Sequence, residues 1–499
     1  MKQFEFFGPV TFCYALFYTF CMFRNGSGIS FPFFIAASLL YLCFALSKLG
    51  LTLKKGSGFY MVCMMLLAVS TFCTDDARII VFNKCGIFLL GMCFLLKQFY
   101  DTTRWDFGKY LTAIFQMMFL GLAEFCQPFA DAKEYFSRQK GNSKGNVWYG
   151  FLGAVIALPV LVIVIFLLSG ADAVFRKLIN QLLEGIRFDN LFNICFRIGF
   201  LFMASYMLLS FLCKKKIPEE VRDKRTGEPM IAITMDVLLT IVYLIFSVIQ
   251  IVYLFLGKMQ LPEGYTYAAY AREGFFQLLA VSILNLILVL IGLGRFRESR
   301  ILKGILTLMS MCTFVMIASS AMRMLIYIHY YNLTFLRILV LWGLAVLFVV
   351  FVGIMIQIFQ KQFPLFRYSM VVVTVLYLVL SFSHPDLWIA YVNVEATKGS
   401  PEGVSCDYNY LAGLSADAAP VMIPYLKEMG FQMEDFYDRD SLSGKNFWDY
   451  AGKGDFGYYY LGNIKDSTEN FGIRTYNVSR HMALRQIQKA TADSPLSGR

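Results

Sequence analysis

The stretch Phe151-Leu-Gly-Ala-Val-Ile-Ala-Leu-Pro-Val-Leu-Val-Ile-Val-Ile-Phe-Leu-Leu168 decides the fold class of this chain. It contains no charged residue and only one proline and one glycine. A bilayer core needs about 20 such residues in helical form. Similar stretches recur through roughly the first 383 residues, whereas the last 116 or so residues contain none. The sequence therefore predicts a multi-pass membrane protein.

The composition of the whole chain agrees with this reading. Hydrophobic residues make up 58% of the chain and charged residues 16%, against about 45–50% and 25% in soluble domains. Phenylalanine alone contributes 50 residues, and the mean hydropathy is +0.58. A soluble core of this size needs far less apolar surface, so lipid is the expected solvent for most of the chain.

The net charge of +11 is unevenly distributed along the chain. Residues 384–499 carry 11 Lys/Arg and 15 Asp/Glu, whereas the remaining residues carry 34 and 19. A basic excess in short loops between apolar segments is typical of cytoplasmic loops. Because the tail is acidic, the basic charge does not indicate a nucleic-acid partner.

We predict an all-α integral membrane helical bundle of about 12 transmembrane helices, followed by a small, mainly helical C-terminal soluble domain. The weakest spans are 58–73, which is short, and 79–96, which contains Asn83 and Lys84. The predicted spans are 6–23, 29–47, 58–73, 79–96, 109–126, 147–169, 191–212, 232–257, 275–294, 304–326, 335–358 and 364–383.

Three regions follow from this pattern: N-terminal transmembrane helices over 1–146, a transmembrane core over 147–383, and a C-terminal domain over 384–499. Within the core, residues 172–188 carry a single apolar stripe at helical spacing. This segment is either a helix in the membrane interface or a cap packed on the bundle.

Helical patterns dominate the C-terminal domain. They cover 387–396, 407–414, 416–429 and 476–490. The aromatic and glycine-rich stretch 444–462 between the last two is expected to form a short hairpin or an irregular packing loop.

The charges of the loops predict the orientation of the second half. The linkers 213–231 and 295–303 are rich in Lys and Arg and are separated by two spans, so both are expected in the cytoplasm. The C-terminal domain is then extracytoplasmic. The lysine-rich loop after the second span disagrees, because twelve spans place it outside. One weak segment that is re-entrant or miscounted, giving eleven or thirteen spans, would remove the conflict.

Polar residues inside spans are the first candidates for function, because lipid makes them costly. A transporter would use such residues to line a substrate or ion path. The alternative is that charges near span ends reach the interface and that Asn285 bonds a neighbouring helix. The candidates are Asn285, Glu124, Asp236, Arg323 and Lys84.

Signals for catalysis, metals and cofactors are weak. The 12 cysteines include no CxxC pair and the chain has only three histidines, which disfavours zinc modules and disulfide frameworks. No nucleophile, metalloprotease or phosphate-loop motif is present. Acidic pairs such as Asp75-Asp76 are interpreted as loop residues. We therefore predict no catalytic residue, no metal ligand and no cofactor.

Several local patterns recur together in a known family. They are the run Leu261-Pro-Glu-Gly-Tyr-Thr-Tyr-Ala-Ala-Tyr-Ala-Arg-Glu-Gly-Phe-Phe276, the segment starting Gly170-Ala-Asp-Ala-Val-Phe175, Pro385-Asp386-x-Trp388-Ile389-Ala390 with Asn393, the stretch from Tyr410-Leu411 to Pro420, and Tyr476-Asn-Val-Ser479. Over roughly residues 150–490 the chain resembles bacterial polytopic membrane proteins filed as domain of unknown function four-one-seven-three, with a sibling at four-one-five-three. The resemblance implies many spans and a helical soluble end, and no activity.

The predicted outside loop before the ninth span offers a second set of candidates. Tyr267, Tyr270 and Arg272 lie where aromatic rings favour the membrane interface. They either anchor the loop or form a lid that meets an anionic ligand or the C-terminal domain.

The sequence thus leads to three functional hypotheses for a protein of the bacterial cytoplasmic membrane. The first is a non-enzymatic scaffold or sensor whose extracytoplasmic domain meets an envelope or protein partner. The second is a transporter that uses the intramembrane polar residues. The third is a membrane enzyme acting on a lipid-linked substrate.

Overall fold

The computed structural model describes residues 4–103, 105–138, 188–219, 225–252, 267–399, 407–431, 433–436, 455–468 and 472–492, with short pieces between 161 and 175. In these parts the chain is helical, apart from turns and one isolated parallel bridge between Gly227 and Phe296. The predicted all-α fold is confirmed for the described residues.

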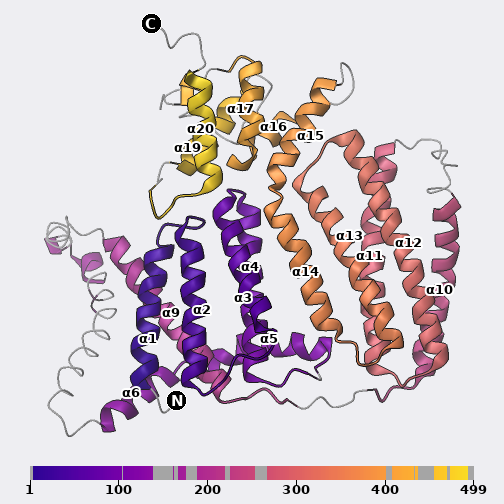
Figure 1. The fold of residues 1–499 in the computed structure, drawn as a ribbon, viewed down its shortest axis with the longest axis horizontal. Coiled ribbons are helices and arrows are strands. Elements are labelled where there is room, and N and C mark those ends of the chain that lie inside the picture. Colours follow the sequence, from indigo (N-terminus) through magenta and orange to yellow (C-terminus); the bar gives the residue numbers. More distant parts are fainter. Residues whose placement is uncertain are drawn as a thin grey trace.

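Long, roughly parallel helices form the body of the molecule (Figure 1). Along the chain, α1, α2, α3, α4 and α9 pack as one group, and α10 to α13 as another, with α14 between them. These helices are α1 Phe4–Met22, α2 Ser30–Lys48, α3 Ser57–Cys73, α4 Ala77–Phe99, α9 Phe188–Cys213, α10 Pro229–Gln250, α11 Tyr267–Arg295, α12 Arg300–Tyr331, α13 Phe335–Phe359 and α14 Leu365–Phe382.

The predicted count of twelve spans is not reached in the described part of the chain. There, nine helices are long and apolar enough to cross a bilayer, or ten if one bent pair counts as a single span. The short helix α3, with 17 residues, falls below that length. The predicted span 147–169 and the amphipathic segment 172–188 lie almost wholly outside the described residues.

The predicted span 109–126 runs along one end of the bundle. It forms α5 Phe107–Gly121 and η1 Leu122–Glu124, followed by α6 Gln127–Arg138 after a bend of 48°. Near its start, the ring of Tyr110 stacks on Phe366 at the beginning of α14, with centroids 3.9 Å apart. At its other end, Glu124 pairs with Lys214, just past the end of α9. Both ends of α5 therefore lie at the same end of the bundle, as Figure 1 shows.

This end of the bundle, here called the basic end, gathers the described loop residues 49–56, 100–103, 105–106, 214–219, 225–228 and 296–299. The Lys54 ammonium donates to the Tyr100 carbonyl at 2.7 Å, and the Trp105 indole donates to the Glu219 carbonyl at 3.3 Å. The lysine-rich loop after α2 therefore lies beside the linker that follows α9. Without a crossing at 109–126, the charges of these loops agree with one orientation.

The C-terminal helices gather at the opposite end, here called the domain end (Figure 1). They enclose an apolar core that includes Leu411, Met422 and Tyr460 and that continues into the bundle through Ile79 of α4 and Phe335 of α13. The elements are α15 Pro385–Gly399, α16 Tyr408–Ala412, η3 Ala416–Ala418, α17 Ala419–Glu428, η4 Met433–Phe436, α19 Phe456–Thr468 and α20 Val478–Ala492. Helix α19 replaces the hairpin or loop expected for the described end of 444–462.

One buried amide joins the two groups of helices through α14. Asn83 of α4 donates to Thr71 of α3 at 3.1 Å and accepts hydrogen bonds from Tyr377 and Ser381 of α14 at 2.8 and 2.7 Å. Its side chain is fully buried. The residue that weakened the prediction of the fourth span thus has hydrogen-bond partners on two neighbouring helices.

Candidate functional site

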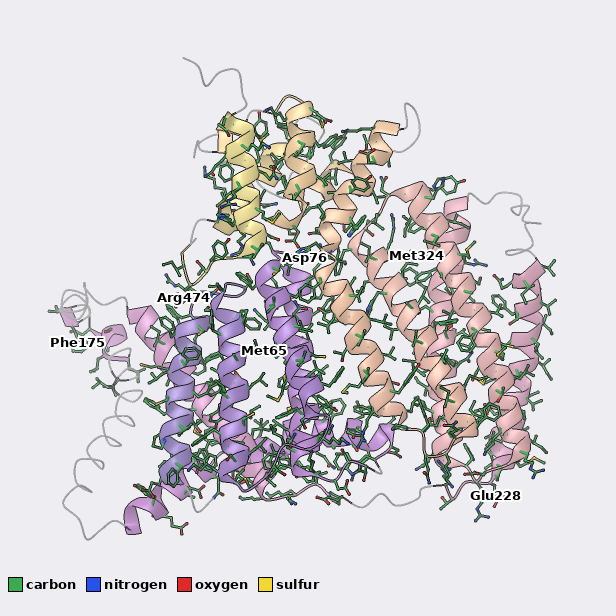
Figure 2. All side chains as sticks on the ribbon, viewed as in Figure 1. Met65, Asp76, Phe175, Glu228, Met324 and Arg474 are labelled. Atoms are coloured by element: carbon green, nitrogen blue, oxygen red, sulfur yellow. The ribbon has the colours of Figure 1, made fainter. Side chains whose placement is uncertain are left out.

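The C-terminal domain meets the bundle through the turns at the domain end. Asn477 donates to the carbonyls of Ser27 and Thr74, at 3.2 and 2.9 Å, and so touches the α1–α2 and α3–α4 turns together. Asn393 of α15 exchanges two hydrogen bonds with the backbone of Leu333, between α12 and α13. Figure 2 labels Asp76 and Arg474 at this boundary.

Charged side chains concentrate at this boundary in a group that we call the junction cluster. Three of its members lie in the α3–α4 turn and the first turn of α4. Two lie at the chain break after α14, and the other two belong to the C-terminal domain. Its members are Asp75, Asp76, Arg78, His384, Asp386, Asp417 and Arg480.

Arg78 holds one side of the junction cluster. Its guanidinium binds both carboxyl oxygens of Asp76, at 2.8 and 2.9 Å, and also contacts Asp386. Asp76 is the N-cap of α4, accepting from the Arg78 amide, which fixes the start of that helix. The second oxygen of Asp386 accepts the Ser415 amide at 2.9 Å. Two buried carboxylates thus share one guanidinium across the boundary.

Asp417 holds the centre of the junction cluster, with a fully buried carboxylate. One oxygen accepts from the Thr74 hydroxyl at 2.5 Å and lies 3.2 Å from His384 Nδ1. The other oxygen accepts the Asp75 backbone amide at 2.8 Å. A residue of the C-terminal domain therefore caps the α3–α4 turn.

A third contact within the cluster comes from Arg480 on α20. Arg480 Nε donates to Asp75 at 2.6 Å. One residue earlier, the Ser479 hydroxyl donates to the Cys73 carbonyl at the end of α3. The carbonyls that α3 leaves unpaired at its end are therefore bonded by side chains of the domain. These contacts explain how a helix of 17 residues ends inside protein rather than in lipid.

Burial and pairing shift the pKa values of the carboxyl groups in the junction cluster in opposite directions. Burial raises the pKa of Asp75 and of Asp386 above the ordinary value. Burial also acts to raise the pKa of Asp417, but hydrogen bonding and charge from His384 hold it below the ordinary value. The hydrogen bond to Asp417 in turn raises the pKa of His384. The cluster therefore combines carboxyls that favour a proton with a histidine that favours its cation.

The chain break after α14 positions two members of the cluster. His384 has φ of +50°, a left-handed conformation that ends α14. Pro385 then begins α15, where a missing backbone N–H is tolerated. The His384-Pro385 step thereby points His384 toward Asp417 and leaves Asp386 in the first turn of α15, facing Ser415.

A second group of polar side chains, the polar seam, lies between α10, α11 and α12. All of its members are buried. Gln250 accepts from Ser319 at 2.6 Å, and Asn285 donates to Thr313 at 2.9 Å, so both neighbours of α12 are bonded to it. The seam consists of Asp236, Thr240, Ser247, Gln250, Asn285, Thr313, Ser319 and Arg323.

Three of the predicted candidates belong to the polar seam. Asn285 bonds a neighbouring helix through its amide nitrogen, as the alternative reading expects. Arg323 reaches Gln250 at 3.4 Å and lies against Gly274, where a side chain would collide with the guanidinium. Asp236 is 1% exposed, and neither of its carboxyl oxygens has a hydrogen-bond partner within the described residues.

The other two intramembrane candidates lie elsewhere. Glu124 sits at the basic end and pairs with Lys214 and Lys216, at 2.5 and 2.7 Å. Lys84 of α4 extends its ammonium toward Gly26 in the α1–α2 turn and over the Phe31 ring. The structure therefore separates Glu124 and Lys84 from the polar seam, and each has a local structural role.

The loop candidates fall at the start of α11. Tyr267, Tyr270 and Arg272 belong to its first turns, and their side chains lie outside the described residues. The anchor and lid alternatives for these residues stay predictions.

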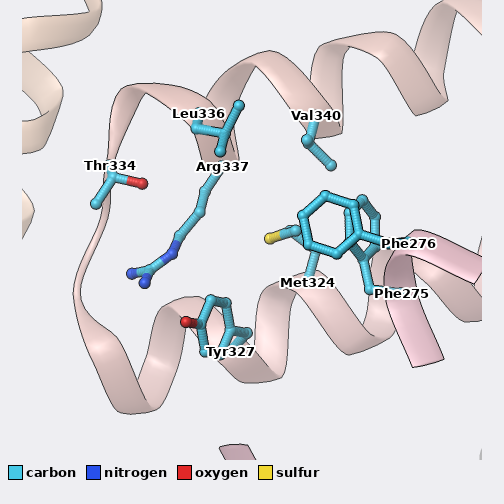
Figure 3. Close-up of a pocket in the computed structure, with 8 residues that line it drawn as sticks. All are labelled: Phe275, Phe276, Met324, Tyr327, Thr334, Leu336, Arg337 and Val340. Carbon is cyan, nitrogen blue, oxygen red and sulfur yellow. The ribbon is translucent and has the colours of Figure 1, made fainter. Parts of the chain in front are cut away.

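A pocket of about 360 Å³ opens at the domain end of α11, α12 and α13 (Figure 3). Phe275, Phe276 and Met324 give it an apolar wall. Its cation, Arg337, lies over the Tyr327 ring and donates to the backbone carbonyls at the end of α12. Because Arg337 is already bonded, the pocket does not indicate an anion site.

Metal binding finds no support in the part of the chain that the structure describes. No group of three or more His, Cys, Asp or Glu residues there is arranged to hold a metal ion. In the junction cluster, the carboxylates are instead bonded to guanidinium, hydroxyl and amide donors of the chain.

Comparison with known protein families gives one match. The family model described as "Domain of unknown function (DUF4153)" matches residues 61–425, nearly three-quarters of the sequence. The chain belongs to the DUF4153 family. This confirms membership of a family of unknown function, although the number matched is that of the expected sibling rather than four-one-seven-three. Neither the curated proteins nor the solved structures gave a match.

The DUF4153 match begins earlier than the resemblance predicted. It starts in α3 and ends in α17, and so includes the α3–α4 turn, His384, Asp386 and Asp417. It excludes Arg480 and the rest of α20. The family region thus contains most of the junction cluster.

Sequence reasoning missed the junction cluster as a unit. Asp75 and Asp76 were interpreted as loop residues, and Pro385-Asp386 as a helix start. The available signal was the placement of acidic residues directly after apolar spans, at 75–76 and 386. Such residues lie at the membrane surface beside any domain docked there.

Proposed function

We propose that this DUF4153 protein is a scaffold or sensor of the bacterial cytoplasmic membrane, with its C-terminal domain on the extracytoplasmic side. The basic end carries the Lys- and Arg-rich linkers, which supports its placement in the cytoplasm. The domain at the opposite end then faces the envelope, where a protein or envelope partner would meet it.

The observation that carries the proposal is the junction cluster. Asp417 and Arg480 of the domain bond the α3–α4 turn, and Asp386 bonds both Arg78 of α4 and the Ser415 amide. A partner that shifts the domain must therefore disturb buried ion pairs at the start of α4 and just after α14. Such pairs have discrete arrangements, so the bundle is coupled to the domain rather than loosely tethered to it.

A charge exchange tests this coupling. Arg480→Asp places two carboxylates together and removes one partner of a buried pair, which costs about 3 kcal/mol or more. We expect hydrogen exchange at residues 74–76 and 472–480 to accelerate by roughly a hundredfold through local opening. The double variant Asp75→Arg/Arg480→Asp should restore slow exchange. Arg485→Asp, on the exposed face of α20, is the matched control.

The same variants, tested in cells, show whether the C-terminal domain is functionally coupled to the bundle or only attached to it. A sensor predicts that Arg480→Asp reproduces the phenotype of deleting residues 384–499, and that Arg485→Asp does not. If Arg480→Asp opens the junction in exchange experiments while cells remain as wild type, the junction does not carry the function.

A transporter is the second candidate, and the polar seam is the observation that favours it. Buried polar side chains follow one face of α10 from Asp236 to Gln250, and Gln250 bonds Ser319 and Arg323 of α12. Uptake assays with Asn285→Leu test this candidate. A transporter loses flux while the protein still inserts, whereas a scaffold keeps its function.

A further inference from the structure

The carboxyl group of Asp236 differs from the other buried acids of the molecule. Both of its oxygens are buried and without a hydrogen-bond partner among the described residues, and the side chain is 1% exposed. In the junction cluster, by contrast, Asp76, Asp386 and Asp417 each bind at least two donors. Asp236 is therefore as buried as these aspartates of the junction cluster, but it lacks the hydrogen-bond donors that bind their carboxylates.

Its position lies inside the apolar layer. Asp236 is seven residues after the first residue of α10, about 10 Å along the helix axis at 1.5 Å per residue. It lies on the face that packs against α12, between Ala232 and Thr240. The outer face of α10 is apolar and exposed, with Leu238 and Ile241 more than half accessible. Neither water nor lipid headgroups therefore reach the carboxyl from the outer face.

The charged and titratable groups around this part of α10 do not neutralise a carboxylate. On α10 itself, Tyr243 is the titratable group that interacts with Asp236. On the buried face of α12, such groups are Cys312 and Arg323. Arg323 bonds Gln250, which lies about 21 Å from Asp236 along α10.

The first turn of α12 offers no counter-charge either. Arg300 is exposed. Lys303 contacts Glu298 at 3.5 Å. An ionised carboxylate at Asp236 would thus be buried without a compensating charge, which is among the costliest arrangements in a protein.

We propose that Asp236 is a proton-binding site inside the membrane, at the basic end of the polar seam. A bound proton removes the buried charge and leaves a neutral carboxylic acid. The seam continues from this acid through Thr240, Ser247 and Gln250, whose side chains offer hydroxyl and amide groups. The site deepens the transport candidate, in which it would bind the coupling proton, but proton binding itself does not require transport.

Carbodiimide labelling tests the site in the full-length protein in native membranes. Dicyclohexylcarbodiimide, an apolar reagent, adds to protonated carboxyl groups within apolar surroundings. We expect an adduct on Asp236, located by peptide fragmentation, whose rate of formation falls about tenfold per pH unit above the titration point. Glu228, at the start of α10 with a 69% exposed side chain, is the internal control. It should react instead with a water-soluble carbodiimide.

The outcomes separate the proposal from its alternatives. Absence of an adduct on Asp236 at every pH, or a rate independent of pH, overturns the proton site. Asp236→Asn should accumulate and lose the label, since the amide is close in shape to the protonated acid. If this variant does not accumulate, the fragmentation of the wild-type peptide still assigns the site.

Proton flux in proteoliposomes distinguishes this site from the transport candidate. Labelling of Asp236 with no proton or coupled flux supports the proton site and contradicts transport. Flux without labelling of Asp236 contradicts the proton site and leaves transport standing.

Discussion

Single residues decide where this protein tolerates buried charge. Asp417 is completely buried, yet Thr74, His384 and the Asp75 amide all bond its carboxylate. Asp236 is equally buried and has no such partner within the described chain. Two aspartates of similar burial therefore have different chemistry, because the cost of a buried charge depends on its partners.

Proton uptake at the junction predicts how stability depends on pH. The folded-state pKa values of His384, Asp75 and Asp386 are raised, so their contributions are present at low pH and lost as pH rises through those values. The His384 contribution is complete below its unfolded value of about 6.5. We expect the unfolding midpoint in detergent to fall as pH rises above that value, and to fall less in His384→Gln.

Asp417 contributes to the pH dependence of stability in the opposite direction. Its pKa is lowered, so its contribution is present above the ordinary value and is lost only as pH falls through the lowered one. Acid should therefore weaken the junction only well below neutrality. Identical pH profiles for wild type and His384→Gln would show that the His384–Asp417 contact does not stabilise the fold.

A close backbone approach at Gly28 yields a second prediction. A Cβ there would lie 2.5 Å from the Arg474 carbonyl oxygen and 2.6 Å from the Thr475 Cα. Neither backbone atom can rotate away, so Gly28→Ala must separate the α1–α2 turn from the C-terminal segment. We expect a loss of about 1–3 kcal/mol in unfolding free energy. Gly58→Ala, which meets nothing within 4 Å, is the control and should not lower the unfolding midpoint.

At the scale of elements, contacts with neighbouring segments decide the placement of a helix more than its length and hydropathy do. Helix α3 is short for a bilayer, yet Ser479 and Asn477 of the C-terminal segment bond the carbonyls at its end. The bent segment of α5, η1 and α6 is long and apolar enough to cross when taken together, but contacts of Tyr110 and Glu124 hold both ends of its first part at the basic end. An apolar segment thus crosses or lies flat according to what binds its ends.

The placement of α5 is testable by cysteine labelling. In a background with the native cysteines replaced, we expect Phe107→Cys and a retained Cys126 to react with an impermeant maleimide from the same side of the membrane. This is the side of the basic end, because both ends of α5 contact it. Labelling from opposite sides would show that the segment crosses, and the orientation of the first four helices would then need revision.

At the scale of the whole molecule, α14 and the C-terminal domain unite two groups of helices. Asn83 joins α3 and α4 to α14, and Tyr368 of α14 donates to the Val349 carbonyl of α13. The domain adds contacts to the turns that precede α2, α4 and α13. The bundle is therefore closed at one end by the domain and carries its basic loops at the other.

This arrangement predicts one consistent topology. Cysteines that replace Lys55 and Lys215 should both be labelled only from the cytoplasmic side, because their loops share the basic end. A tag after Arg499 should be cleaved by protease added to intact spheroplasts. Protection of the tag, or labelling of the two cysteines from different sides, would contradict the proposed orientation.

The sequence by itself determined the class of the protein, most of its spans and the helical nature of its tail. Apolar stretches of bilayer length carry this information locally, because the hydrophobic effect and backbone hydrogen bonding act on each segment alone. The basic linkers around 213–231 and 295–303 likewise predict an orientation for the second half. Asn285 and Arg323, which the sequence offers as candidates because they are polar residues within apolar spans, are buried in the structure.

Only the tertiary structure decided which segments do not cross and which charges meet. The partners of Asp417 lie 33 to 343 residues away in the sequence, and Arg480 meets Asp75 over a separation of 405 residues. No local pattern encodes such pairings, because they depend on how the domain rests on the helix turns. The ion pairs of Glu124 and the stacking of Tyr110 on Phe366 place both ends of the α5 segment at the basic end. The carboxyl of Asp236 is buried without a hydrogen-bond partner among the described residues.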